Sequence, residues 1–160
     1  MDTLIFNALI QKECEMHAFA KKVLGYLHKG DIVLLEGPLG AGKTTFVRGI
    51  LESLGYLKSV RSPTFNLIQT FDTHPPIMHA DLYRLDSAEG IGLEDYLETH
   101  LCLIEWGEKT EGWIDPAYIW KIKIDFAECG RLIQIIPPMA ATNENASMMQ
   151  ELSSFLDDKG

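Results

Sequence analysis

A glycine-rich segment, residues 37–44, has the residue types and spacing of a phosphate-binding loop. It reads G-P-L-G-A-G-K-T and matches the pattern G-x-x-x-x-G-K-S/T in full. Glycines allow positive φ angles and remove Cβ atoms, so successive backbone N–H groups can turn inward around a phosphate. Lys43 would reach the β and γ phosphates, and the hydroxyl of Thr44 could ligate Mg²⁺. The segment therefore predicts nucleotide binding.

Two acidic residues are candidates for the carboxylate that such a magnesium site needs. Glu105 follows the apolar run LCLI, and Asp81 ends the run IMHAD. Both would emerge at the carboxyl edge of a sheet, where ligands bind in open α/β folds. In phosphate-loop enzymes, a carboxylate at the end of a neighbouring buried strand holds Mg²⁺. Either acid could also merely end a strand at the surface, and these patterns leave open which one holds the metal.

Other residues near these motifs each have two interpretations. Thr64 lies in the loop after the phosphate-loop helix, a region that contacts the γ phosphate in switch-type hydrolases. It could equally be a turn threonine beside Pro63. His79 could act as a base or be a packed strand residue. Trp106 could cover the nucleotide or belong to the core.

The elements that must position the loop are a strand before it and a helix after it. Residues 32–35, IVLL, suit a strand that is buried on both faces. Residues 44–55 place apolar side chains at helical spacing, with Gly55 as the C-cap. The glycines therefore lie between a strand and a helix, which is the context that the motif requires.

The remaining segments predict an α/β fold. A helix is expected within residues 8–28, and turns with a short acidic helix within residues 85–100. Further strands are expected at 67–71, 77–80, 101–104, 117–126 and 132–136. Alternating strands and helices indicate a P-loop NTPase-like fold, with a mostly parallel central sheet, helices on both faces and an antiparallel extension at one edge.

Length and composition favour one nucleotide-binding domain. The chain has 160 residues, of which 46% are hydrophobic. We expect residues 1–136 to form the P-loop domain, and residues 137–160 to form a linker and a short amphipathic helix. The three cysteines have no CxxC spacing, so neither a disulfide framework nor a zinc site is indicated. A secretory leader and an apolar run of roughly 20 residues are both missing, so we expect a cytoplasmic protein without a membrane segment.

The charge balance bears on possible partners. The formal net charge is −9, from 14 basic and 23 acidic residues. Nucleic-acid binding draws most of its affinity from lysine and arginine side chains on phosphates. We therefore expect that, in a nucleic-acid pathway, another subunit would hold the RNA or DNA.

The combined pattern resembles the TsaE (YjeE) family, the ATPase component of bacterial tRNA threonylcarbamoyladenosine synthesis. The resemblance extends from about residue 10 to residue 136. It is carried by GPLGAGKTTFVRG (37–49), SPTFNL (62–67), HADLYRL (79–85) and LIEWGE (103–108). One departure is Pro38, which stands where many relatives are expected to have an acidic residue.

The resemblance implies a function and partners. Proteins of this kind bind ATP and ADP with Mg²⁺, hydrolyse ATP slowly alone, and are activated by the TsaD–TsaB complex. They support modification of adenosine 37 in tRNAs that read codons beginning with A, and contact the tRNA mainly through these partners. They do not perform the threonylcarbamoyl transfer.

The resemblance also implies a role for each site residue. Thr44 and Glu105 would hold Mg²⁺ together with Asp81, which is also tied most directly to hydrolysis. Ser62 and Thr64 would form a switch-like loop, with Thr64 and Lys43 assisting catalysis. The nucleotide would be bound by Gly37, Leu39, Gly40, Ala41, Gly42, Lys43, Thr44, Thr45, Ser62 and Trp106.

Two other functions remain open from the residues themselves. A small-molecule P-loop kinase would close a lid with several arginines over the transferring phosphoryl group. This chain has only Arg48, Arg61, Arg84 and Arg131, with no cluster in a lid-like insert. A non-catalytic nucleotide-sensing module would shift the conformational population of a partner through binding alone.

Overall fold

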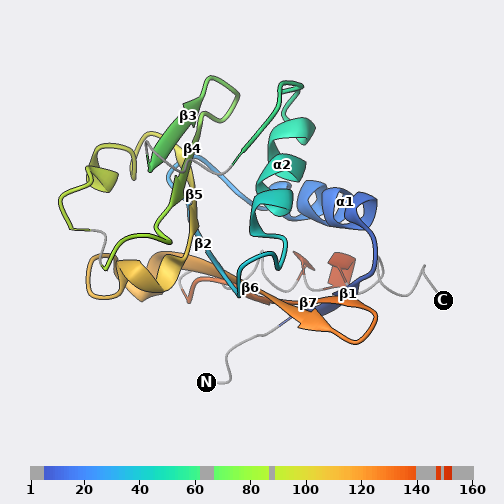
Figure 1. The fold of residues 1–160 in the computed structure, drawn as a ribbon. Coiled ribbons are helices and arrows are strands. Elements are labelled where there is room, and N and C mark those ends of the chain that lie inside the picture. Colours follow the sequence, from blue (N-terminus) through green and yellow to red (C-terminus); the bar gives the residue numbers. More distant parts are fainter. Residues whose placement is uncertain (1–5, 62–66, 87–88, 140–146, 149, 153–160) are drawn as a thin grey trace.

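Strands from both halves of the chain build one mixed sheet. The computed structural model describes residues 6–61, 67–86, 89–139, 147–148 and 150–152, and within them seven strands have the order β1-β7-β6-β2-β5-β4-β3 (Figure 1). Their bounds are β1 Phe6–Ile10, β2 Ile32–Glu36, β3 Ile68–Phe71, β4 Ile77–Asp81, β5 Leu101–Glu105, β6 Ile119–Ala127 and β7 Gly130–Ile136.

The centre of the sheet is parallel, as predicted. Strands β6, β2, β5 and β4 pair in parallel, so their carboxyl ends meet at the same edge. Residues 32–35 of β2 are buried on both faces, which explains their continuous apolar run. Antiparallel strands flank this centre on both sides rather than at one edge only, because β3 pairs antiparallel with β4 while β7 and β1 extend the opposite side.

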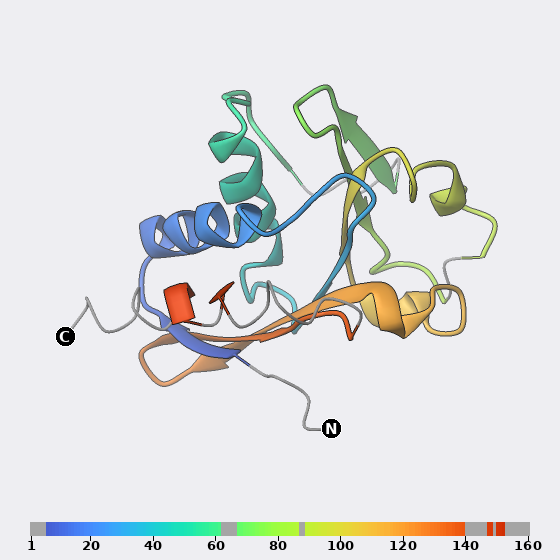
Figure 2. The ribbon, with the colours of Figure 1, turned by 180° about the vertical axis from the view of Figure 1, so that it is seen from behind.

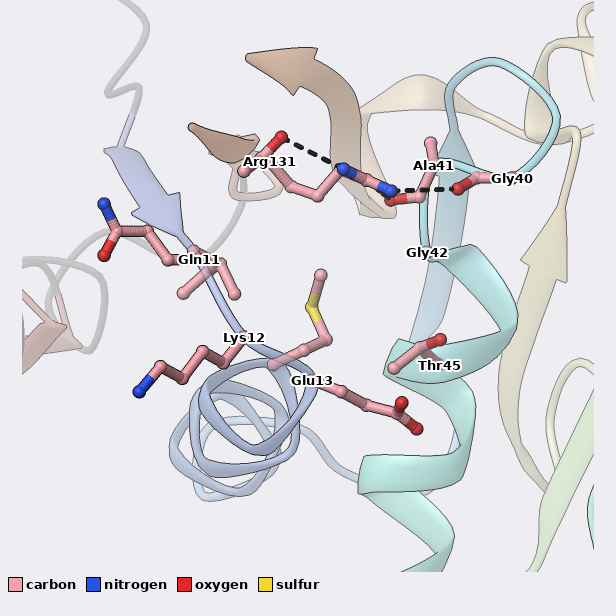
Figure 3. A pocket seen from close by; sticks show the side chains of 11 residues that line it. Gln11, Lys12, Glu13, Gly40, Ala41, Gly42, Thr45 and Arg131 are labelled. Carbon is pink, nitrogen blue, oxygen red and sulfur yellow. Dashed lines mark hydrogen bonds between the residues drawn. The ribbon is translucent and has the colours of Figure 1, made fainter. Parts of the chain in front are cut away.

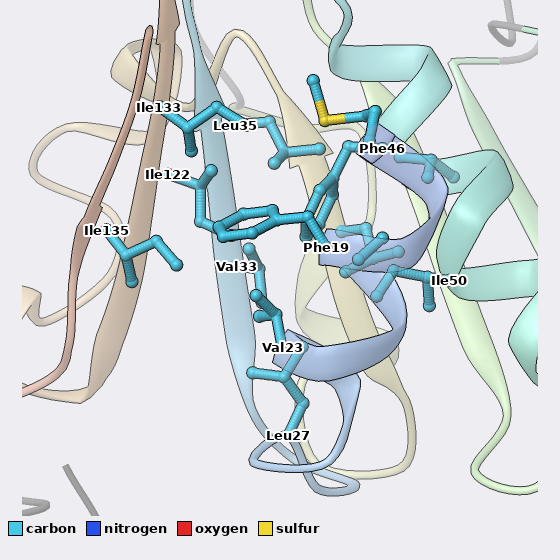
Figure 4. Close-up of a cluster of buried hydrophobic side chains, with 14 of the residues drawn as sticks. Phe19, Val23, Leu27, Val33, Leu35, Phe46, Ile50, Ile122, Ile133 and Ile135 are labelled. Atoms are coloured by element: carbon cyan, nitrogen blue, oxygen red, sulfur yellow. The ribbon is translucent and has the colours of Figure 1, made fainter. Parts of the chain in front are cut away.

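Helices cover the two faces of the sheet differently. The α-helices α1 (Glu13–Leu24) and α2 (Lys43–Ser53) pack side by side on one face (Figure 1, Figure 2). Figure 4 shows Phe19 and Phe46 meeting β2 and the β6–β7 hairpin in the main hydrophobic cluster. Short 3-10 helices cover the other face, namely η1 (Leu93–Asp95) and η2 (Gly107–Thr110), while η3 (Pro116–Tyr118) precedes β6.

Two predicted helices are shorter than expected. The helix expected within 8–28 begins only at Glu13, because Phe6–Ile10 form β1 with alternating buried and exposed side chains. That period of two places its buried side chains on the core when β1 pairs with β7. The acidic helix expected within 85–100 is limited, in its described part, to η1. Gly90 and Gly92 there have φ values of 77° and 84°, which interrupt a right-handed helix.

The helix after the glycine loop ends beside the predicted glycine: α2 ends at Ser53, its C-cap is Leu54, and Gly55 is the first residue beyond the cap. Gly55 has φ 87°, and its N–H donates to the carbonyl oxygen of Glu52 at 3.0 Å. The next N–H, of Tyr56, donates to the carbonyl oxygen of Leu51 at 3.0 Å. These two bonds form a Schellman motif, which satisfies carbonyl groups at the C-terminus of α2.

The end of the described chain packs on the core. Residues 147–148 and 150–152 are helical, and Met148 and Leu152 are fully buried in the main cluster. Glu151 accepts hydrogen bonds from Lys22, at 3.3 Å, and from the hydroxyl of Tyr26. The other apolar residues of the expected terminal helix, Met149, Phe155 and Leu156, lie outside what the structure describes. None of the helices in the described ranges is both long and apolar enough to cross a membrane.

Candidate nucleotide-binding site

The backbone of the glycine-rich loop connects the end of β2 to the start of α2. Gly37, Gly40 and Gly42 have φ values of 148°, 79° and 117°. A Cβ atom on Gly37 would lie 2.0 Å from the carbonyl oxygen of Ile124, so only glycine fits there. Gly42 is the N-cap of α2 and makes no side-chain cap. The first N–H groups of α2 are therefore suited to an anion.

A cavity of about 210 Å³ lies beside this loop, at the carboxyl edge of the parallel strands. It is lined by Leu39, Gly40, Ala41, Gly42, Lys43, Thr44, Thr45, Asp81, Glu105 and Trp106. All of these residues were expected at the site from the sequence, and the fold brings them together from three segments of the chain. Gly37 shapes the start of the loop without lining the cavity. Ser62 and Thr64 lie outside the described residues, so their roles stay predictions.

The side chain of Lys43 is folded against its own loop. Its Nζ donates to the carbonyl oxygens of Gly37 and Pro38, the latter at 3.2 Å. The same atom lies 3.8 Å from the centroid of the Trp106 ring, which is a cation–π contact. Burial lowers the pKa of Lys43, while the charges of Glu105, Glu108 and Asp81 act in the opposite direction. The ammonium group is thus held between the carbonyl groups at the start of the loop and the Trp106 ring.

The backbone at Trp106 positions its indole ring. Trp106 has φ 61°, a left-handed conformation that costs a residue other than glycine about 1–3 kcal/mol. Its N–H donates to the carbonyl oxygen of Leu35 at 2.9 Å, which ties this turn to the end of β2. The ring packs on a second hydrophobic cluster, on the sheet face opposite α1 and α2, which includes Leu34, Leu82 and Ile104. It also contacts Lys43 and the Tyr83 ring. Trp106 therefore belongs partly to the core and also lines the cavity, and its role in covering a nucleotide stays a prediction.

Glu105 is the most constrained carboxylate of the site. Its side chain is 3% exposed and accepts a hydrogen bond from the Thr44 hydroxyl at 2.9 Å. Nε2 of His79 lies 2.6 Å from its other oxygen. His79 is fully buried, as a packed strand residue would be, but it also holds Glu105. Alternation along β4 places His79 and Asp81 on the same face of the sheet. No local pattern in the sequence indicated that His79 would contact Glu105 on β5.

Asp81 lies beside Glu105 on the neighbouring strand. The two residues are in register between β4 and β5, and Asp81 Oδ1 accepts a hydrogen bond from the Tyr83 N–H at 3.0 Å. Thr44, Glu105 and Asp81 supply hard oxygen atoms of the kind that Mg²⁺ prefers, so the donor set fits this ion. Among the described residues, no three His, Cys, Asp or Glu side chains could hold a metal by themselves, so phosphate or water oxygens would have to complete the coordination.

A second cavity, of about 220 Å³, lies on another side of the loop and shares Gly40, Ala41, Gly42 and Thr45 with the first (Figure 3). Its remaining lining residues are Ile10, Gln11, Lys12, Glu13, Met16, Gly130 and Arg131. None of these seven was expected at the site. They come from the end of β1, the start of α1 with the connection between them, and the start of β7, and only the tertiary fold brings these segments to the loop.

A strand, a loop with left-handed glycines and a helix, placed at the carboxyl edge of a parallel sheet, define a P-loop NTPase-like α/β protein. Comparison with known proteins narrows this class. The family model described as "Threonylcarbamoyl adenosine biosynthesis protein TsaE" matches residues 10–133, which is most of the chain. The chain therefore belongs to the TsaE family.

Individual relatives agree with this assignment. The tRNA threonylcarbamoyladenosine biosynthesis protein TsaE of Haemophilus influenzae is 39% identical over 155 residues, covering 91% of this chain and 96% of that protein. The protein of the same name from Rickettsia bellii is 47% identical over 113 residues, covering 68% and 78%. A crystal structure of Bacillus subtilis YdiB superposes with a TM-score of 0.78 at 29% identity, covering 97% of this chain and 98% of that one.

Proposed function

We propose that this chain is a Mg²⁺-dependent ATPase that supports the formation of N6-threonylcarbamoyladenosine in tRNA. Its relatives are named tRNA threonylcarbamoyladenosine biosynthesis proteins. The observation that carries the nucleotide part of the proposal is the convergence of Lys43, Thr44 and Glu105 on one cavity beside the glycine-rich loop. A triphosphate needs inward-facing amides, a cation and a metal site, and these residues supply them.

The glycine-rich loop and the start of α2 would bind the phosphates. The amides of Gly40 and of residues 42–45 would bind phosphate oxygens. The side chain of Lys43 would move from the loop carbonyls to contact the β and γ phosphates. Thr44 and Glu105 would hold Mg²⁺, which when bound neutralises charge on the phosphate oxygens. The hydrogen bond between the two residues supports this role, because it places the Thr44 hydroxyl oxygen beside the Glu105 carboxylate oxygens, where one ion can contact both.

The second cavity offers a place for the nucleoside. It adjoins the loop through shared residues, and the buried side chains of Ile10 and Met16 give it an apolar wall. An adenine base buries apolar ring faces while its edges need polar partners, and this lining contains both kinds of group. We propose that ATP and ADP extend from the first cavity into this one.

Hydrolysis would depend on Asp81 and on a partner. The carboxylate of Asp81 is oriented by the Tyr83 N–H and lines the cavity, so it can direct a water molecule at the γ phosphate. No arginine from the described chain lines that cavity. Phosphoryl transfer requires cations at the transition state, and P-loop hydrolases often receive one from another protein. We therefore expect the chain to hydrolyse ATP slowly by itself and faster when a partner supplies the cation.

The proposed partner is the TsaD–TsaB complex in the cytoplasm. The target would be adenosine 37 of tRNAs reading codons that begin with A, with the tRNA held mainly by the partners. The net charge of −9 supports this division of labour, because it disfavours direct binding to RNA. The chain itself would not transfer the threonylcarbamoyl group.

Phosphate release from Mg·ATP tests the proposal. We expect slow release by the chain alone, faster release with TsaD and TsaB, and loss of tight ATP binding in the Lys43→Ala variant. Binding without release under every condition would instead identify a nucleotide sensor. ATP consumption that requires a small-molecule acceptor would identify a kinase. Absence of any binding to magnesium–adenine nucleotides, with or without partners, would refute the proposal.

A further inference from the structure

Arg131 connects the β6–β7 hairpin to the glycine-rich loop. Its Nε donates to the carbonyl oxygen of Ala41 at 2.9 Å, and Nη2 lies 3.5 Å from the carbonyl oxygen of Gly40 (Figure 3). Its Nη1 donates to the carbonyl oxygen of Gly130 at 3.1 Å. One planar guanidinium group therefore joins two peptide groups of the loop to the first residue of β7.

The hairpin holds this side chain in place. Arg131 lies on the same face of β7 as Ile133, which is fully buried beneath the α-helices. On the paired strand, the ring centroid of Phe126 lies 4.7 Å from the guanidinium carbon. Gly130 approaches β1 so closely that a Cβ atom there would lie 2.2 Å from the carbonyl oxygen of Ile10. The base of the side chain is thus fixed by the packed sheet.

The hydrogen bond to Ala41 has a consequence for the neighbouring amide. In a trans peptide group, the C=O and the N–H point in opposite directions. The peptide group between Ala41 and Gly42 turns its carbonyl toward Arg131, so the N–H of Gly42 points away from the guanidinium. The preceding amide, of Ala41, is held within the loop by the carbonyl oxygen of Pro38 at 3.1 Å.

We propose that Arg131 is a positioning residue for phosphate binding, which acts by fixing the orientation of the loop peptide group between Ala41 and Gly42. This inference rests on the proposed nucleotide binding. A guanidinium group is charged at every relevant pH and offers several donors in a rigid plane, so it can hold two carbonyls at once. Without it, the loop would have to order this peptide group when phosphate binds, and affinity would fall.

Calorimetric titration of the full chain with Mg·ADP and with Mg·tripolyphosphate tests the role. Arg131→Gln should weaken both ligands, on the order of tenfold or more, because a charge-assisted hydrogen bond behind the binding amide is lost. The affinity of Arg131→Lys should lie between those of wild type and Arg131→Gln. A single ammonium group keeps the charge but lacks the two-pronged geometry of a guanidinium. Arg48→Gln is the matched control for tripolyphosphate, because it removes a guanidinium that bonds the Val60 carbonyl, at 3.1 Å, and pairs with Glu13, at 3.5 Å, but bonds no carbonyl of the loop.

The outcomes separate the alternatives. If the Arg131 variants lost affinity for ADP but not for tripolyphosphate, Arg131 would contact the nucleoside, and the positioning role would be overturned. Equal affinities in wild type and both Arg131 variants, or an equal loss in the Arg48 control, would also overturn it. The backbone amide of Gly42, followed by NMR, should shift in Arg131→Lys even without ligand. If wild type itself bound neither ligand, the proposed function would fail rather than this inference alone.

Discussion

Nε2 of His79 lies 2.6 Å from Oε2 of Glu105, and both side chains are almost completely removed from solvent. The same carboxylate accepts a hydrogen bond from the Thr44 hydroxyl at 2.9 Å. A buried carboxylate needs donors, and here they come from β4 and α2, which are separate elements. Glu105 is thereby held in one orientation at the edge of the cavity. His79 supports the proposed metal site from the buried side, by holding the carboxylate of Glu105 in place.

Replacing His79 should affect both stability and the use of Mg²⁺. His79→Leu leaves the carboxylate without one donor and should destabilise the fold by about 1–3 kcal/mol. It should also raise the Mg²⁺ concentration needed for ATP binding. His79→Gln can place an amide N–H near the position of Nε2 and should restore part of both properties. Chemical denaturation and magnesium titrations measure them. A Leu variant with wild-type behaviour in both would contradict the role.

Removing the Glu105 carboxylate should weaken the magnesium dependence of nucleotide binding. In Glu105→Ala, Thr44 would remain as a hydroxyl donor without its carboxylate partner. We expect the affinity for ATP to respond less to added Mg²⁺ than in wild type. Affinities measured over a series of magnesium concentrations check this, with Glu111→Ala as an exposed acidic control. An unchanged titration would count against metal binding by Glu105.

Asp81 should separate binding from hydrolysis. Asp81→Ala keeps the loop, Lys43 and Glu105, so ATP binding should remain measurable. Hydrolysis should stop, because the group proposed to direct water is lost. Phosphate release in the presence of TsaD and TsaB is the measurement, and Asp72→Ala, an exposed acid after β3, is the control. Equal hydrolysis in Asp81→Ala would remove this residue from the mechanism.

Two loop glycines should respond differently to alanine. At Gly37, the new Cβ would lie 2.0 Å from the carbonyl oxygen of Ile124, so β6 or the loop would have to move. We expect a loss of about 3 kcal/mol or more in the free energy of unfolding. At Gly40, nothing lies within 4 Å of that position, and only the left-handed conformation costs about 1–2 kcal/mol. Denaturant unfolding measures the free energy of unfolding of both variants. Similar losses of stability in the two would show that β6 can move away from the new Cβ atom at position 37.

The cysteines should report the fold through their reactivity. Cys14 and Cys129 are exposed, whereas burial raises the pKa of the Cys102 thiol to about 12. A thiol reagent at pH 8 should therefore modify two cysteines quickly, and the third only after denaturation. Because the pKa of Cys102 is about 8.5 in the unfolded chain, its contribution to stability should be present below that pH and be lost gradually as the pH rises toward 12. Rapid modification of all three native thiols would contradict the burial of β5.

Local patterns were sufficient for the core of the site. The glycine motif is contiguous, and a strand on one side and a helix on the other follow from apolar spacing alone, so β2, the loop and α2 were predicted together. The runs ending at Asp81 and Glu105 likewise predicted β4 and β5. The strand Phe6–Ile10 was missed because its short alternation adjoins a stronger helical pattern, and only pairing with β7 reveals it.

The sequence by itself determined that a loop of bare amides, with Lys43 and Thr44, lies between a strand and a helix, because these features depend on neighbouring residues. The tertiary structure alone decided which distant groups surround that loop. Parallel pairing of β4 with β5 brings His79 against Glu105, and the β6–β7 hairpin brings Arg131 to Ala41 from 90 residues away. Such contacts depend on which strands, distant along the chain, become neighbours in the sheet, and a local pattern of residues does not specify this order.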